Sequence, residues 1–279
     1  MLCYDVIEVF DMFITRIEVQ KKNPKRFNIF VNKGHGEEFG FSVHEDTLVQ
    51  FGLRKGLELD EFEVIEIQYG DEARKAYNKA IEYLGYKMRT KKEVYDYLRK
   101  KNVGEQIILE VIQLLIEQKY IDDEEYAKAY VRTQMNTSKK GPVLIEKELS
   151  EKGIPETLIE EALTQFSSEH QIDVAYSIAE KYETKSDNIS FQQRQQKIEQ
   201  ALIRKGFSFN IIHIVLDMLP KEENDNKEWN ALCIQAEKAK KRYAKFDSYT
   251  ATQKLKQFLY RKGFSIDLID RYIHENEDM

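Results

Sequence analysis

The chain of 279 residues is 42% hydrophobic and 33% charged and holds only 4 prolines and 12 glycines, which excludes collagen-like and disordered classes. No apolar run approaches the roughly 18 residues of a membrane span. The acidic N-terminus lacks the basic leader of a signal peptide, so we expect a cytoplasmic protein with no membrane partner. The net charge of −6 argues against a strongly basic protein that binds bare DNA.

Residues 1–70 are predicted to form a small β-rich domain. Apolar and polar residues alternate there in short runs, which turn-forming residues such as Asn23-Pro24 and Gly34 separate. The predicted strands are residues 13–19, 27–31, 38–43 and 61–67, and one short helix is expected at 44–52. Together these elements indicate a small twisted sheet with one short helix.

Four internal repeats follow this domain. Each repeat is anchored by a leucine, with a lysine three residues later and a glycine or asparagine four residues later. The leucines are Leu98, Leu149, Leu202 and Leu259; the lysines are Lys101, Lys152, Lys205 and Lys262; the last column holds Asn102, Gly153, Gly206 and Gly263. Apolar residues recur at fixed positions before and after each leucine, so the repeat is structural.

The columns describe two amphipathic helices joined by a tight turn. The glycine or asparagine is the left-handed residue that ends the first helix, and Ser208 and Ser265 are predicted N-caps of the second. A further helix precedes each pair, at residues 71–84, 123–134, 172–182 and 228–243. The predicted repeats are residues 71–120, 121–170, 171–224 and 225–279. The predicted fold is therefore mainly α, with three-helix repeats in an elongated array after a small β-rich domain.

Several ordered motifs resemble the RecX family of regulatory proteins. The segment Lys254–Ser265 is similar to the terminal RecX repeat, and Ile121–Ala127 to an early family signature. Lys139–Pro142, leading to Lys152-Gly153-Ile154, is also similar, and Phe41–Asp46 resembles the head of the longer, Firmicute-type members. The resemblance covers about residues 72–275 and also the small β-rich domain at residues 1–70, which we call the head. Asn102 departs from the glycine of its column, and Glu151 interrupts the basic pair of the second repeat, which puts any charge-based contact of that repeat in doubt.

The resemblance implies a regulator of the RecA recombinase. RecX proteins bind RecA filaments on single-stranded DNA, lie along the filament groove, and suppress ATP hydrolysis and strand exchange. Such a protein acts by binding and needs no cofactor. Two alternatives remain open: a protein that binds single-stranded DNA without RecA, and a helical scaffold for another partner.

Basic residues near the helix ends are the candidate contacts. A lysine in the last turn of a helix either stabilises the negative end of that helix or contacts phosphate or acidic groups of a partner. Lys139-Lys140 precedes Pro142, which can begin a helix, so this segment is either an anion site or a solvated loop. The candidate contacts of RecA or DNA are Lys100, Lys101, Lys139, Lys140, Arg204, Lys205, Lys241, Arg242, Arg261 and Lys262.

Lys241 and Arg242 belong to a basic helix near Tyr243 and Phe246. Alternating basic and aromatic residues suit single-stranded nucleic acid, whereas helical spacing equally suits aromatics in a core. Last helices rich in Glu and Asp argue against readout of the DNA major groove.

Enzyme motifs and metal-ligand spacings are absent from the sequence. It contains no phosphate-binding loop, HExxH, GxSxG or dinucleotide fingerprint, and its histidines and cysteines do not cluster. His44-Glu45-Asp46 is typical of a helix start, because acidic residues favour a helix N-terminus. We therefore expect no catalytic residue and no metal.

Overall fold

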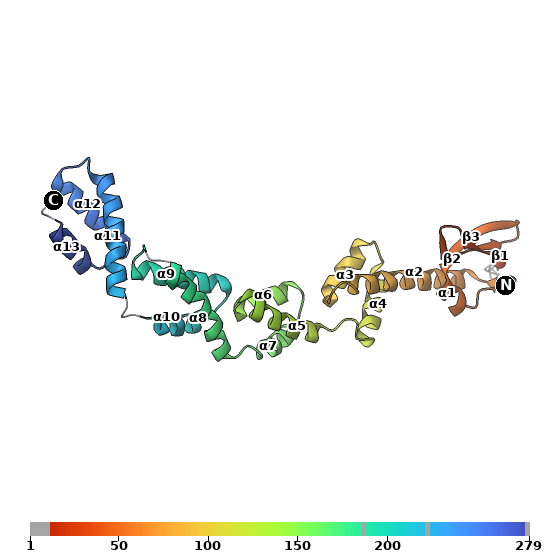
Figure 1. Ribbon diagram of the computed structural model, residues 1–279. Coiled ribbons are helices and arrows are strands. Elements are labelled where there is room, and N and C mark those ends of the chain that lie inside the picture. The colour runs from red at the N-terminus through yellow and green to blue at the C-terminus, as the bar shows by residue number, and fades with distance from the viewer. Residues whose placement is uncertain (1–11, 186–187, 221–223, 277–279) are drawn as a thin grey trace, which may run out of the picture. The chain divides into compact units, whose positions relative to one another are not determined.

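The computed structural model describes residues 12–185, 188–220 and 224–276, and helices dominate these residues (Figure 1). The chain divides into two compact units between Tyr126 and Ala127. The first unit holds a small antiparallel sheet and the first repeat, and the second holds most of the remaining repeats. The predicted class, mainly α with three-helix repeats and an N-terminal β-rich domain, is confirmed.

The sheet of the first unit has four strands in the order β3-β2-β1-β4, and all pairs are antiparallel. The bounds are β1 Met12–Gln20, β2 Asn23–Asn32, β3 Glu37–His44 and β4 Glu58–Leu59, with α1 at Glu45–Gln50. One face of the sheet forms the core, in which Ile14, Ile29, Val31 and Val43 are fully buried. The first three predicted strands and the short helix are thus confirmed.

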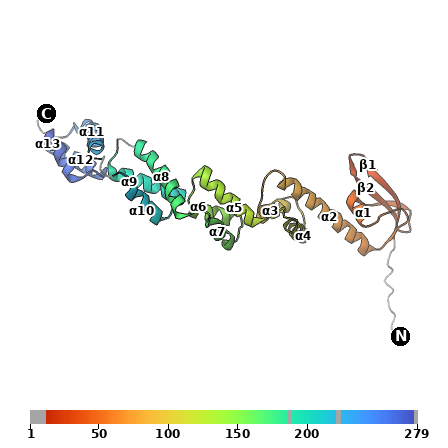
Figure 2. The same ribbon diagram turned by 60° about the horizontal axis from the view of Figure 1, so that its bottom comes forward.

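The fourth predicted strand, residues 61–67, is wrong. These residues begin the long helix α2, Glu61–Leu84 (Figure 2). Asp60 accepts a hydrogen bond from the Glu63 backbone, and the Glu63 carboxylate accepts one from the Asp60 backbone. This reciprocal capping box fixes a helix start. Val64 and Ile67 then pack against the sheet core at helical spacing. Apolar and acidic residues also alternate over residues 61–67, and this alternation on the surface of a helix resembles a strand pattern.

Asp71 attaches α2 to the sheet. Its carboxylate is almost fully buried and accepts hydrogen bonds from Arg26 at 3.0 Å and from the His44 backbone at 2.6 Å, and it pairs with Lys75 at 2.7 Å. Burial alone raises the pKa of this carboxyl, but the hydrogen bonds from Lys75, His44 and Arg26 outweigh burial and lower it. The end of β3, strand β2 and helix α2 therefore meet at the Asp71 carboxylate.

We expect Asp71→Ala to loosen the sheet from α2 and to cost about 3 kcal/mol, because the largely buried Arg26 loses its carboxylate partner and keeps only its hydrogen bonds to Ser42. The lowered pKa means that this stabilisation is present at neutral pH and is lost as pH falls below the ordinary Asp range. Hydrogen exchange of residues 12–84 measures both effects. The control is Asp270→Ala, which removes an exposed pair with Lys256 and is expected to cost under about 1 kcal/mol. Equal protection in the two variants contradicts the role of Asp71.

The helices after α2 fall into three-helix groups. Repeat 1 comprises the end of α2 with α3 Lys91–Lys100 and α4 Glu105–Glu117. Repeat 2 comprises α5 Asp123–Thr133, α6 Pro142–Glu151 and α7 Glu156–Leu163, with a π-helical turn η1 at Gln134–Ser138. Repeat 3 comprises α8 Ser168–Lys185, α9 Phe191–Lys205 and α10 Phe209–Met218. Repeat 4 comprises α11 Asn224–Tyr243, α12 Ser248–Arg261 and α13 Ile266–Glu275.

The repeat columns correspond to core and cap positions. All four anchor leucines are fully buried: Leu98, Leu149, Leu202 and Leu259. The residues four positions later all have left-handed φ values, 57° at Asn102, 80° at Gly153, 85° at Gly206 and 80° at Gly263. Ser208 and Ser265 accept hydrogen bonds from backbone N–H groups three residues on, as predicted for N-caps.

Candidate functional site

Each repeat has a corner, which we define as the lysine three residues after the anchor leucine together with the left-handed residue that follows it. We describe the predicted basic residues by their position relative to these corners. The corners are Lys101-Asn102, Lys152-Gly153, Lys205-Gly206 and Lys262-Gly263. Each lies where the second helix of its repeat ends, so a corner presents the last carbonyl groups of that helix. The structure of the second compact unit shows what two of these carbonyl ends contact.

The corner of repeat 3 is seated on the start of α6 in repeat 2. The Gly141 N–H donates to the Lys205 carbonyl at 2.7 Å, and the Val143 N–H donates to the Gly206 carbonyl at 3.1 Å. The Lys205 ammonium in turn donates to the Ser138 carbonyl at 2.9 Å. The positive end of one helix thus meets the negative end of another, and both satisfy backbone groups that a helix end leaves open.

The corner of repeat 4 is seated in the same way on the start of α9 in repeat 3. Ser190, the N-cap of α9, donates its hydroxyl hydrogen to the Lys262 carbonyl and accepts a hydrogen bond from the Gln193 N–H. The Gln235 side chain also donates to the Asn188 carbonyl at 2.7 Å. We call this arrangement, a corner against the start of the second helix in the preceding repeat, the joint.

The joint requires glycine for a reason that the sequence analysis did not identify. A Cβ on Gly206 would lie 2.5 Å from the backbone nitrogen of Leu144, and a Cβ on Gly263 would lie 2.9 Å from the Ser190 hydroxyl. At Gly206 glycine is therefore needed for close approach to backbone as well as for its positive φ, whereas the contacts at Gly263 are with side-chain atoms. The sequence holds one signal of this constraint: the corner with Asn102 belongs to repeat 1, which no repeat precedes.

We expect Gly206→Ala to destabilise the contact between repeats 2 and 3 by about 3 kcal/mol, because left-handed strain adds to a clash with backbone. Gly56→Ala is a matched control, since Gly56 has φ of +80° but open space around its Cβ position. Only the strain term, about 1 kcal/mol, is expected there. Urea unfolding together with hydrogen exchange of α6 and α9 measures the difference. Equal losses in the two variants would show that φ alone requires glycine.

Lys139 and Lys140 lie beside the joint and are engaged within the protein. The Lys139 ammonium donates to the Ser177 hydroxyl at 2.6 Å, and the Lys140 ammonium pairs with Glu148 at 2.6 Å. Burial raises the pKa of Glu148, but the hydrogen bonds from Lys140 and Tyr130 outweigh it and lower that pKa. The predicted anion position at the start of α6 faces the carbonyl groups of the repeat 3 corner. Lys139, Lys140 and Lys205 thus support the fold, and contact with RecA or DNA stays a prediction for them.

Other predicted cations are exposed. Lys100 and Lys101 end α3, Arg204 lies in the last turn of α9, and Arg261 ends α12. Lys262 is half-buried, with its ammonium 5.7 Å from the Phe258 ring. Exposed cations therefore stand at the helix C-termini of repeats 1, 3 and 4, where a dipole role and a partner contact are both compatible with the geometry.

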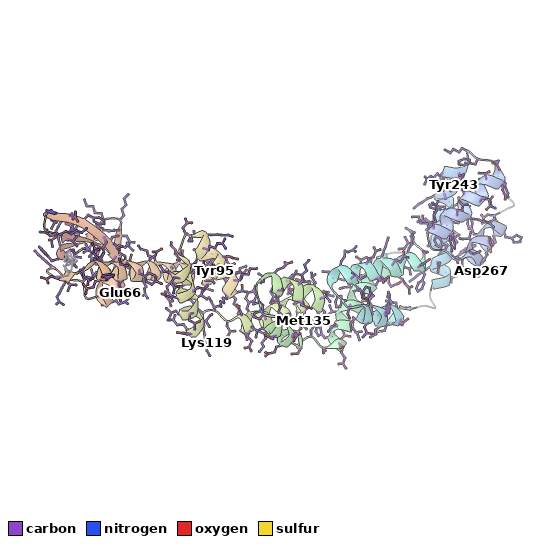
Figure 3. The ribbon with its side chains drawn as sticks, turned by 180° about the vertical axis from the view of Figure 1, so that it is seen from behind. Glu66, Tyr95, Lys119, Met135, Tyr243 and Asp267 are labelled. Carbon is purple, nitrogen blue, oxygen red and sulfur yellow. The ribbon has the colours of Figure 1, made fainter. Side chains whose placement is uncertain are left out.

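The basic end of α11 combines a core aromatic and an exposed one. Lys241 and Arg242 are exposed. Tyr243, labelled in Figure 3, packs against Phe258 at 6.4 Å in the core of repeat 4. Phe246 is 37% exposed, with the Lys245 ammonium 5.4 Å and the Lys254 ammonium 4.8 Å from its ring. Phe246 and the nearby Tyr249, which is 76% exposed, are thus aromatics of this region that are available for stacking.

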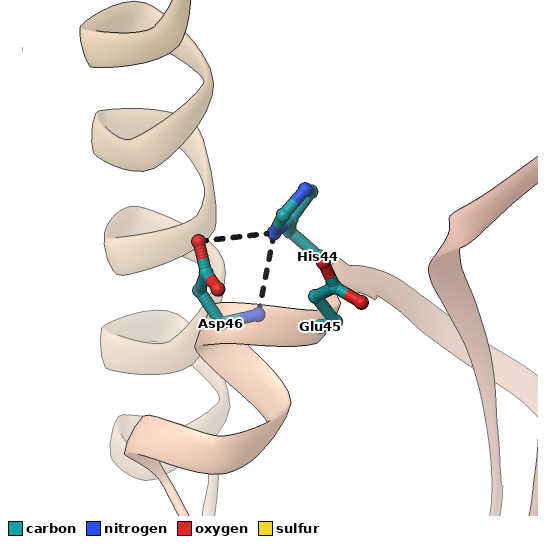
Figure 4. Close-up of side chains that lie close together, drawn as sticks. All are labelled: His44, Glu45 and Asp46. Carbon is teal, nitrogen blue, oxygen red and sulfur yellow. Dashed lines mark hydrogen bonds and ion pairs between the residues drawn. The ribbon is translucent and has the colours of Figure 1, made fainter.

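His44, Glu45 and Asp46 lie close enough for three ligand atoms to meet, but their contacts are those of a helix start (Figure 4). The His44 Nδ1 accepts a hydrogen bond from the Asp46 N–H at 3.2 Å, so the lone pair on that nitrogen is used. The Asp46 carboxylate pairs with Arg74 at 2.5 Å. Both contacts belong to the start of α1, so the capping role predicted from the sequence fits this group.

The fold and these surfaces define a class of protein: tandem three-helix repeats with basic residues at their helix ends, following a small antiparallel sheet. Models of the RecX family match most of this chain. The RecX N-terminal domain matches residues 12–60, the first three-helix domain 76–115, the second 122–163, and the third both 169–216 and 226–273. The chain belongs to the RecX family of regulatory proteins.

Individual relatives agree with the family models. The chain is 50% identical to a regulatory protein RecX of Bacillus cytotoxicus over 93% of this chain and 96% of the relative. It is 46% identical to one of Bacillus cereus over the same shares. A crystal structure of a regulatory protein RecX matches 74% of this chain and 99% of its own, with 38% identity and a TM-score of 0.63. RecX from Lactobacillus salivarius matches 54% and 99%, with 42% identity and a TM-score of 0.52.

The described residues include no helix that combines the length and the apolar character needed to cross a bilayer. The two longest of the described helices, α2 and α11, carry charged residues along their whole length.

Proposed function

We propose that this protein is a cytoplasmic regulator of the RecA recombinase. It binds in the groove of RecA filaments on single-stranded DNA and inhibits ATP hydrolysis and strand exchange, and so limits homologous recombination and DNA repair. The observation that carries the proposal is family membership across both the head and the repeats, at 50% identity over 93% of the chain.

The repeat geometry is compatible with this role. A filament repeats the same chemical surface along its length, and a chain of similar repeats carries the same kind of group at the same place in each repeat. The exposed cations Lys100, Arg204 and Arg261 occupy comparable places in three repeats. A phosphate or a carboxylate on a regular partner can pair with each of them, and each such exposed pair contributes under about 1 kcal/mol. Several weak contacts along one body then add up to useful affinity.

We expect the charge reversal Arg204→Glu with Arg261→Glu to raise the concentration needed for half-inhibition of RecA about tenfold, because about 1.4 kcal/mol of pairing is lost. The measurement is ATP hydrolysis by the cognate RecA on single-stranded DNA, with the protein titrated in. Lys197→Glu is the matched control, since Lys197 is an exposed cation of α9 away from the corner. Unchanged inhibition by the double variant removes the corners from the interface. Failure of the unmutated protein to alter ATP hydrolysis contradicts the proposed function itself.

The second candidate function is direct binding of single-stranded DNA without RecA. Phe246, with the ammonium groups of Lys245 and Lys254 over its ring, favours it, because bases stack on such exposed aromatics. The two functions differ in salt dependence. A steep loss of oligonucleotide binding with salt in the absence of RecA supports the second, since phosphate contacts release counterions.

A further inference from the structure

Repeats 3 and 4 can be compared residue by residue. The same family domain matches residues 169–216 and 226–273, and the anchor leucines Leu202 and Leu259 lie at the same place in the two segments. In repeat 3, Arg194 of α9 is 1% exposed and its guanidinium pairs with Glu183 of α8 at 3.0 Å. A buried arginine and its carboxylate partner therefore fill the space between the first two helices of this repeat.

Repeat 4 has different residues at the same two places. Ala251 stands where repeat 3 has Arg194, and Lys240 stands where it has Glu183. A cavity of about 320 Å³ lies there, between α11, α12 and α13, and both substituted residues line it. The long side chain that fills repeat 3 is absent, and the charge at the other position is reversed. The hollow therefore comes from two substitutions that act on the same space.

The walls of the cavity indicate the chemistry of an occupant. Lys240 is about one-third exposed, and its ammonium lies 3.4 Å from Glu237 and 5.1 Å from the centre of the Tyr272 ring. Ser248 adds a hydroxyl donor, and Ala251 and Leu255 add apolar surface. A positive donor and a hydroxyl beside apolar walls suit an anion carried on a short aliphatic arm. The Lys240 charge disfavours a guanidinium or ammonium occupant.

A carboxylate fits this setting better than a nucleic-acid phosphate. Tyr272 donates to the Glu237 carboxylate at 2.7 Å, and this hydrogen bond lowers the pKa of Glu237, which is thus ionised at neutral pH. Asp247 immediately precedes Ser248 and is a further exposed acid. A phosphate chain brings several negative charges past these two carboxylates, whereas one carboxylate brings a single charge to Lys240.

We propose that this cavity binds the side chain of a single glutamate in a peptide segment of a partner protein. The carboxylate pairs with the Lys240 ammonium and the Ser248 hydroxyl, and the methylene groups lie against Ala251 and Leu255. The glutamate of the partner and Lys240 thus form between two proteins the kind of acid–base pair that Glu183 and Arg194 form within repeat 3. This assignment is independent of the partner's identity.

The test is fluorescence anisotropy of a rhodamine-labelled hexapeptide that holds one glutamate among alanine and serine residues, with the full chain at low salt. We expect Lys240→Met to weaken binding at least tenfold, since it removes the charge and keeps the length of the side chain. The double variant Lys240→Glu with Ala251→Arg rebuilds the repeat 3 pair and is expected to abolish binding by filling the cavity. Lys238→Met is the matched control, because Lys238 is an exposed cation of the same helix that does not line the cavity.

Three results would overturn the proposal. The first is no anisotropy change with the unmutated chain up to about 1 mM, the weak limit of specific binding. The second is equal peptide binding by the unmutated chain and Lys240→Met. The third is displacement of the peptide by oligothymidylate whose own binding also needs Lys240, which assigns the cavity to phosphate. Circular dichroism establishes folding, and Lys240→Met decides the test if the double variant does not fold.

Discussion

The joint is the contact on which the arrangement of repeats 2, 3 and 4 depends. Two helix ends that would otherwise leave backbone groups without partners satisfy one another, with Gly141 donating to Lys205 and Ser190 donating to Lys262. Whereas the Ser190 contact needs the hydroxyl of that residue, the Gly141 contact joins backbone groups and tolerates side-chain change around it. It does not tolerate a Cβ on Gly206, so the glycine column is the chemical requirement of the joint.

The joint also changes the interpretation of the basic residues. A lysine three places after each anchor leucine looks like one repeated feature in the sequence, yet the structure separates its members. Lys205 donates to the Ser138 carbonyl and belongs to the joint, whereas Lys101 is exposed. The neighbours Arg204 and Arg261 point their charge to solvent from the same helix ends. The ends of α9 and α12 therefore combine carbonyl groups that contact the preceding repeat with exposed cations, Arg204 and Arg261, that are available to a partner.

Much of the fold could be predicted because it follows from local rules. The helical spacing of apolar residues and the capping residues predict the helices of all four repeats. A single column of glycine and asparagine predicts the left-handed residues that end the second helices. The strand at residues 61–67 was misread because alternation also occurs on a helix surface, although the Asp60–Glu63 capping box was present in the sequence. The contacts of Lys139 with Ser177 and of Gly141 with Lys205 join residues far apart in the chain. No local pattern encodes such pairs, so the candidate site was only partly predictable.

Tandem repeats allow one copy to change while another keeps the original solution. Arg194 and Glu183 form a buried pair in repeat 3, and such a pair costs desolvation that good geometry must offset. Replacing one partner alone would leave a buried charge without compensation, which is strongly destabilising. Repeat 4 differs at both places, and its cavity opens to solvent, so Lys240 stays hydrated at its open side. With Ala251 and a solvent-facing Lys240, repeat 4 thus avoids this penalty at both places, and the hollow is the space that the proposed glutamate occupies.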